Sequence, residues 1–145
     1  MDPFYFLLQK IREKPGLFLG KKSLEALTHF WDGYGYRNFI ESWENTTGRD
    51  FFENYEEARQ SNVGCEPREQ HFLYGFDAFV HEYYNCEMST LNGTGLISKN
   101  SNSEEEAFDK FFELLDEFLK LTDEQKNEVI ASARNRFLRY YEEGF

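Results

Sequence analysis

The side chains that most often bind metals or carry out catalysis are few and scattered in this sequence. The three histidines are His29, His71 and His81, and no two of them lie three or four residues apart. Because two metal ligands on one helix need that spacing, and no His-Glu-x-x-His motif occurs, the sequence predicts no metal site and no cofactor. Cys65 and Cys86 form no Cys-x-x-Cys motif, and the sequence leaves a disulfide between them open.

A cysteine nucleophile is the enzymatic arrangement that the remaining residues would allow. Cys86 follows His81 and Glu82, and a thiol becomes a nucleophile when an imidazole lies within hydrogen-bonding distance. His81 and Glu82 are adjacent, however, and adjacent residues on a helix point in different directions. No serine lies in a Gly-x-Ser-x-Gly motif, and no Walker-type phosphate loop occurs. We therefore expect the protein not to be an enzyme, and we keep this dispersed site as an alternative.

The charge of the chain narrows the classes of partner. Its 27 acidic residues outnumber its 16 lysines and arginines, and the net charge is −11. Nucleic acids and anionic membrane surfaces both require a basic face, so we expect neither as a partner. A basic protein would be attracted by the same charge, and acidity that only keeps the chain soluble is the alternative. The sequence leaves the oligomeric state open.

The sequence also predicts a cytoplasmic location. No apolar run approaches the roughly 20 residues of a membrane-spanning helix. The segment that begins at Met1 lacks the basic region of a signal peptide. In the cytoplasm, Cys65 and Cys86 would be reduced thiols.

Helical periodicity of the apolar residues runs through most of the chain. This pattern predicts an all-α fold, a single compact bundle of about six helices in one domain that spans residues 1–145. Gly33 and Gly35 fall inside the second helix, where we expect them to allow close approach of another helix or to mark a bend. The expected helices span residues 2–13, 23–44, 49–61, 67–86, 103–119 and 122–141.

Two segments between the expected helices lack the full pattern. The Pro-Gly pair at 15–16 predicts a tight turn, and the apolar run at 17–19 predicts a short buried plug. Residues 88–102 are rich in Ser, Asn and Gly, which predicts a loop that Leu96 and Ile97 tether to the core.

The expected helix at 103–119 has the clearest pattern in the chain. It begins with Ser103 followed three residues later by Glu106, which is a capping box, and its apolar residues recur at helical spacing. Carboxylates follow one another on the outward side, and we take them as the candidate partner-binding surface. A solvated face without a partner is the alternative. These carboxylates are Asp109, Glu113, Asp116 and Glu117.

Two blocks of the sequence resemble a group of small, all-helical bacterial proteins. The first block is Lys14-Pro-Gly-Leu-Phe-Leu-Gly-Lys-Lys-Ser-Leu-Glu-Ala-Leu27, followed by Phe30-Trp-Asp-Gly-Tyr34. It is similar to that group's usual opening, which reads Arg-Pro-(Gly/Ala)-Met-Tyr-Leu-Gly, then Ser-Leu, then Phe-Leu-x-Gly-Tyr. The second block, at 103–108 and 111–115, resembles the group's acidic C-terminal helix.

This resemblance implies a function by binding. Some members of the group resemble immunity proteins of contact-dependent growth inhibition and related polymorphic toxin systems, and the group offers no catalytic motif. The resemblance therefore implies an immunity protein that binds a cognate toxin domain, for example a nuclease, and occludes its active site. A small regulatory adaptor that binds another basic protein is the alternative, and the neighbouring genes would distinguish the two.

Overall fold

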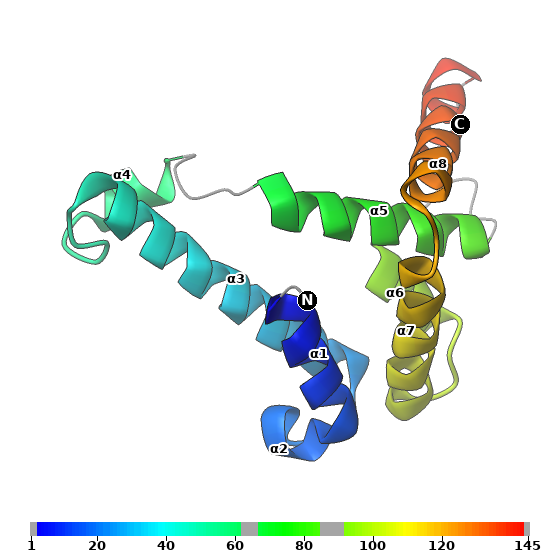
Figure 1. The fold of residues 1–145 in the computed structure, drawn as a ribbon, viewed down its shortest axis with the longest axis horizontal. Helices are drawn as coiled ribbons and strands as arrows, with labels where there is room; N and C mark the ends of the chain where they lie inside the picture. Colours follow the sequence, from blue (N-terminus) through cyan, green and yellow to red (C-terminus); the bar gives the residue numbers. More distant parts are fainter. Residues whose placement is uncertain (1–2, 62–66, 85–91, 144–145) are drawn as a thin grey trace.

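A computed structural model of the protein describes residues 3–61, 67–84 and 92–143 (Figure 1). All regular secondary structure within these ranges is helical, which confirms the all-α prediction. The eight helices described exceed the expected number, about six, because two short helices form where the sequence predicts a turn and a loop. The helices are α1 (Pro3–Glu13), α2 (Pro15–Leu19), α3 (Leu24–Thr47), α4 (Tyr55–Arg59), α5 (Pro67–Tyr83), α6 (Gly93–Lys99), α7 (Glu104–Leu119) and α8 (Asp123–Glu143).

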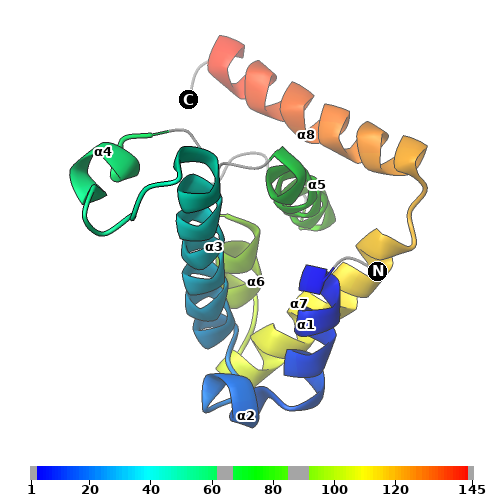
Figure 2. The ribbon, with the colours of Figure 1, turned by 60° about the vertical axis from the view of Figure 1, so that its left-hand side comes forward.

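Helix α3 connects two parts of the molecule. Its first turns lie beside α2, α6 and α7, and its far end carries α4 (Figures 1 and 2). Helix α5 contacts α6, α7 and α8, and α8 packs mainly on α5. The molecule therefore has a crowded region around α7 and an extension formed by the far half of α3 with α4.

The main core is built around α7. Buried residues from α1, α3, α5 and α6 pack against it in one cluster, in which Phe111 is completely buried. The hydroxyl of Ser103 accepts a hydrogen bond from the N–H of Glu106 at 3.1 Å, so the expected N-cap is confirmed. The Glu106 carboxylate accepts from the N–H of Asn102, one residue before the cap.

A second, smaller cluster lies at the far end of α3. Trp43, Phe51 and Ala58 are buried together, with Phe39 and Ile40 packed against them. Phe51 is the centre of this cluster, since its ring meets those of Phe39 and Trp43 edge-on at 5.8 and 6.0 Å. This cluster is separate from the main core and stabilises the junction of α3 with α4.

The prediction of a buried plug at 17–19 is wrong. These residues form the end of α2, where Leu17 is 75% exposed and Phe18 is 38% exposed, and of the three only Leu19 packs against the main core. Successive residues of a helix point about 100° apart, so a run of three apolar residues cannot face one core.

The prediction of a loop is wrong for residues 93–99, which form α6, whereas residues 88–91 lie outside the described part. Leu96 and Ile97 are buried in the main core, as expected. The expected close approach of another helix at Gly33 and Gly35 is not present, because a Cβ added at either position would meet no atom within 4 Å. Helix α3 also runs through both without a break (Figure 1).

Candidate functional site

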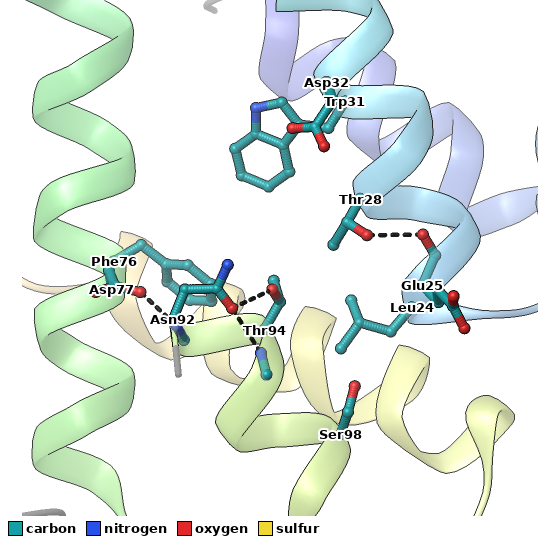
Figure 3. A pocket seen from close by; sticks show the side chains of 12 residues that line it. Leu24, Glu25, Thr28, Trp31, Asp32, Phe76, Asp77, Asn92, Thr94 and Ser98 are labelled. Carbon is teal, nitrogen blue, oxygen red and sulfur yellow. Dashed lines mark hydrogen bonds between the residues drawn. The ribbon is translucent and has the colours of Figure 1, made fainter. Parts of the chain in front are cut away.

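An open pocket of about 750 Å³ lies between α3, α5 and α6 (Figure 3). Its walls come from segments far apart in the sequence: residues 24–32 of α3, residues 76–77 of α5, and residues 92–95 and 98 of α6 and its N-cap. A concave surface with apolar walls and a few polar groups is the usual form of a binding site. We therefore take this pocket as the candidate functional site.

The α3 wall is a stripe of residues on one side of the helix. Leu24, Thr28 and Trp31 follow one another at intervals of four and three residues, which places them on one face. The buried hydroxyl of Ser23 caps this helix by accepting a hydrogen bond from the N–H of Ala26 at 3.2 Å. Because Leu24 is buried in the main core, this face of α3 is turned toward the interior.

The indole of Trp31 stands between the pocket and the main core. Its ring centroid lies 4.9 Å from that of Phe4 and 6.2 Å from that of Phe111, with an edge-on arrangement in the second pair. Figure 3 shows the indole extending from α3 toward α5. Trp31 is only half-buried, so part of its aromatic surface is accessible to a ligand.

Hydrogen bonds hold the α6 wall against α5. The Asp77 carboxylate of α5 accepts a hydrogen bond from the backbone N–H of Gly93. A Cβ added at Gly93 would lie 2.9 Å from Asp77 Oδ1, so a side chain there would force this carboxylate to shift. Asn92 Oδ1 accepts from the N–H of Gly95 at 2.9 Å and from the Thr94 hydroxyl at 3.0 Å (Figure 3). The wall is therefore positioned by the chain's own contacts.

The threonine hydroxyls of the pocket present oxygen acceptors. Thr28 donates its proton to the backbone carbonyl of Glu25 at 2.7 Å, and Thr94 donates its proton to Asn92 Oδ1. A hydroxyl has a single proton to donate but keeps lone pairs that can accept. Both threonines can thus accept a hydrogen bond from a ligand while their internal bonds stay intact.

All charged residues among the described lining are carboxylates, namely Glu25, Asp32 and Asp77. Asp77 is committed to α6, and the Glu25 carboxylate lies 3.7 Å from the imidazole of His29. Asp32, which is exposed next to Trp31, makes no hydrogen bond or ion pair with any described residue. The pocket therefore carries negative charge, and the Asp32 carboxylate is uncommitted.

Two of the carboxylates predicted to bind a partner are engaged within the chain. Asp109 lies 2.8 Å from the ammonium group of Lys22, and Asp116 lies 2.8 Å from the guanidinium of Arg12. Both bonds tie α7 to the N-terminal segments. They join residues far apart in the sequence, so the sequence alone could not reveal that these charges are compensated.

The other two predicted carboxylates also lie on the exposed side of α7, outside the pocket. Glu113 pairs with Lys110 of the same helix at 3.2 Å, and the Glu117 side chain bonds to no other described residue. The structure thus brings all four carboxylates onto one helix face, as expected. Partner binding by this face stays a prediction.

The dispersed enzymatic site is only partly described. His81 Nδ1 lies 2.8 Å from the backbone carbonyl of Asp77, and Glu82 pairs with Arg136 at 3.2 Å. The predictions that concern Cys65 and Cys86, their pairing included, fall outside the described residues. Among the residues that are described, no group of three or more His, Cys, Asp or Glu side chains could hold a metal ion.

Sequence reasoning missed the pocket, although one signal was present. Asp32 follows Trp31 directly, which puts a carboxylate next to the apolar side of α3. The α5 and α6 walls gave no such signal, because their contact depends on how the chain folds back. Within the described ranges, no helix is long and apolar enough to span a membrane.

Comparison with known proteins adds no further constraint on the site. No protein-family model, curated protein or solved structure matches the chain. The resemblance to immunity proteins therefore stays an expectation that rests on the two sequence blocks.

Proposed function

We propose that the protein acts in the cytoplasm as an immunity protein, which binds a basic toxin domain and occludes its active site. The observation that carries this proposal is the pocket between α3, α5 and α6, whose described charged residues are all acidic. The net charge of −11 supports it on the scale of the whole molecule. The first of the two sequence blocks also supplies Leu24, Glu25, Trp31 and Asp32 to the pocket.

Inhibition of this kind requires affinity and shape, and it requires no catalysis. A nuclease toxin binds the phosphates of its substrate through a basic cleft. A protein with strong negative charge is steered toward such a cleft, so charge raises the association rate. Residues that enter pockets and lose contact with water then determine the lifetime of the complex.

The pocket is a better candidate contact than the predicted α7 face. Asp109 and Asp116 on α7 already face cations of the same chain, which reduces the field that a partner would meet. Asp32 at the pocket has no such cation among the described residues. We therefore place the centre of the interface at the pocket, with Glu113 and Glu117 as an outer contribution.

The test is a protection assay with the product of the gene directly upstream, which this proposal requires to be a toxin domain. We expect the protein to restore growth when both are co-expressed, and to bind the purified domain with an association rate that falls as salt rises. Reversal of Glu113 and Glu117 to lysine leaves the bonds to Arg12 and Lys22 intact and should slow association modestly.

Three outcomes separate the alternatives. Protection with salt-sensitive binding supports the immunity function. Binding of a basic protein without any protection would favour the regulatory adaptor. Protection that leaves the toxin unbound would contradict occlusion altogether.

A further inference from the structure

Resting on that proposed function, we propose that the pocket receives an arginine side chain of the basic partner, whose guanidinium contacts the Trp31 indole and pairs with the Asp32 carboxylate. The proposal names the group that anchors the partner. Three observations support it: the charge of the pocket, its hydrogen-bond acceptors, and an arginine that another tryptophan and carboxylate of this chain already hold.

Charge excludes anionic ligands from this site. Its described charged residues are three carboxylates, Glu25, Asp32 and Asp77, with no lysine, arginine or histidine among the described lining. A phosphate or carboxylate ligand would meet repulsion there without a compensating cation. A cation is attracted, and Asp32 can pair with it without losing a bond to another described residue.

Hydrogen bonding favours a ligand with many donors. Thr28 and Thr94 use their protons internally and offer oxygen lone pairs, and Asp32 offers further acceptors. Guanidinium has five N–H donors in one plane and no acceptor, whereas ammonium is a compact, strongly hydrated point charge. Guanidinium therefore fits an acceptor-rich pocket better than ammonium does.

The half-buried indole of Trp31 selects for the same group. Tryptophan gives the strongest cation–π interaction among the aromatic side chains, and a planar guanidinium can also stack on the ring. The methylene groups of the arginine would pack on the exposed part of the Trp31 ring, since Leu24 and Phe76, which also line the pocket, are almost fully buried. The pocket volume, about 750 Å³, leaves room for partner backbone next to the side chain.

The far end of α3 shows this arrangement complete within the chain. The Arg49 guanidinium lies over the ring of Trp43 at 5.5 Å. It donates to the Glu57 carboxylate at 2.9 Å and to the Asn54 side-chain oxygen at 2.7 Å. A tryptophan, a carboxylate and an asparagine thus hold an arginine there. The pocket also has a tryptophan and a carboxylate, Trp31 and Asp32, whereas the oxygen of its asparagine, Asn92, already accepts from Gly95 and Thr94.

The first experiment follows the two indole N–H signals by nuclear magnetic resonance while N-acetyl-arginine amide is added. We expect the Trp31 signal and the Thr94 amide to shift, with a dissociation constant of roughly 1–100 mM for this single-residue probe, while the buried Trp43 stays unchanged. N-acetyl-citrulline amide has nearly the same shape without the charge and should bind at least about fivefold more weakly. Equal shifts with both probes would overturn the proposal.

The second experiment compares Asp32→Asn with Glu128→Gln. Both remove one exposed carboxylate from a helix, and only Asp32 lines the pocket. Asp32→Asn should weaken binding of the arginine probe, and of the toxin domain that the proposed function requires, by about tenfold. Glu128→Gln should leave both affinities unchanged, and circular dichroism should show both variants folded. Trp31→Phe should weaken binding by a smaller factor, since a phenyl ring gives a weaker cation–π interaction.

The outcomes distinguish this inference from the proposed function. If the toxin domain binds and protection occurs while Asp32→Asn has no effect on that binding, the arginine anchor is wrong and the immunity function stands. If the probe binds at Trp31 but partner affinity does not depend on Asp32, the ligand is a free guanidino compound and the inference also fails. If the probe binds and no basic partner exists, the proposed function fails.

Discussion

Each of the two tryptophans of α3 has a carboxylate nearby, but they differ in burial and in whether the chain places an arginine on the ring. Trp43 is buried beneath Arg49, and Glu57 fixes that arginine, so the tryptophan, the cation and the carboxylate form a closed structural joint. Trp31 is half-buried at a pocket, with the Asp32 carboxylate adjacent and no cation among the described lining. Similar residue types therefore hold the fold together where the chain supplies the arginine, and line an open pocket where the described lining supplies none.

The two ends of α3 also differ in the size of the core behind them. Trp31 packs against Phe111, which belongs to a cluster drawn from five helices. Trp43 belongs to a cluster of three buried residues, whose other members are Phe51, before α4, and Ala58 of α4. Stability within a protein follows the amount of buried apolar contact, so the far end should open more easily than the pocket end.

The largest expected effect is the loss of stability on replacing Phe111 with alanine. Its ring is fully buried and lies 5.3 Å from Phe76 and 5.1 Å from Phe112. Removing it leaves a cavity behind Trp31, so we expect the free energy of unfolding to fall by about 3–5 kcal/mol. Chemical denaturation measures this change. A loss below about 1 kcal/mol would show that the core around α7 is not packed as described.

A smaller loss is expected for Phe51→Ala at the far end of α3. Phe51 is as deeply buried as Phe111, but its cluster is separate from the main core, so we expect it to open while the main core stays folded. We expect a decrease of about 1–3 kcal/mol in global stability, with faster amide exchange confined to the end of α3 and to α4. An equal loss for Phe51→Ala and Phe111→Ala would mean that both ends unfold as one unit.

Sequence patterns predicted the long helices because the signals for a long helix lie within its own residues. Helical spacing of apolar residues and the Ser103 cap are local features, and both are present in the structure. The sequence did not predict the short helices α2 and α6, because a helix of five or seven residues has too few turns to show a periodic apolar pattern. Packing against neighbours stabilises them, and that packing is visible only in three dimensions.

The candidate site was harder to predict because it is assembled from three separated segments. Nothing in the sequence near Asn92 indicates that the start of α6 docks on Asp77 or faces Trp31. The α7 carboxylates were predicted on the correct side of their helix. Their pairing with Lys22 and Arg12 depends on the fold, and it shifts the expected centre of binding from α7 to the pocket.

Replacing two glycines in the middle of α3 with alanine should raise the free energy of unfolding. Gly33 and Gly35 lie within the helix with no atom within 4 Å of an added Cβ. Alanine has a higher helix propensity, so each Gly→Ala change should raise the free energy of unfolding by roughly 0.5–1 kcal/mol. Denaturation of the double variant measures the sum. Reduced stability would mean that an unobserved neighbour approaches these positions, and slower amide exchange at α4 would show that the two ends are coupled.

The smallest expected effect is a pH-dependent change in Trp43 fluorescence, caused by loss of the Arg49–Glu57 ion pair. Hydrogen bonding from Arg49 holds the pKa of Glu57 below its ordinary value of 4.5. A carboxylate with a lowered pKa in the folded protein stabilises it fully above the ordinary value, and this contribution is lost as pH falls through the lowered pKa. Protonation of Glu57 should release Arg49 from the Trp43 ring, so Trp43 fluorescence should change at a pH below 4.5. In a Trp31→Phe background, Trp43 is the sole tryptophan, and Glu57→Gln should abolish this transition while Glu53→Gln, at a nearby exposed carboxylate, should preserve it. A transition that persists unchanged in Glu57→Gln would show that the joint at Trp43 does not depend on this ion pair.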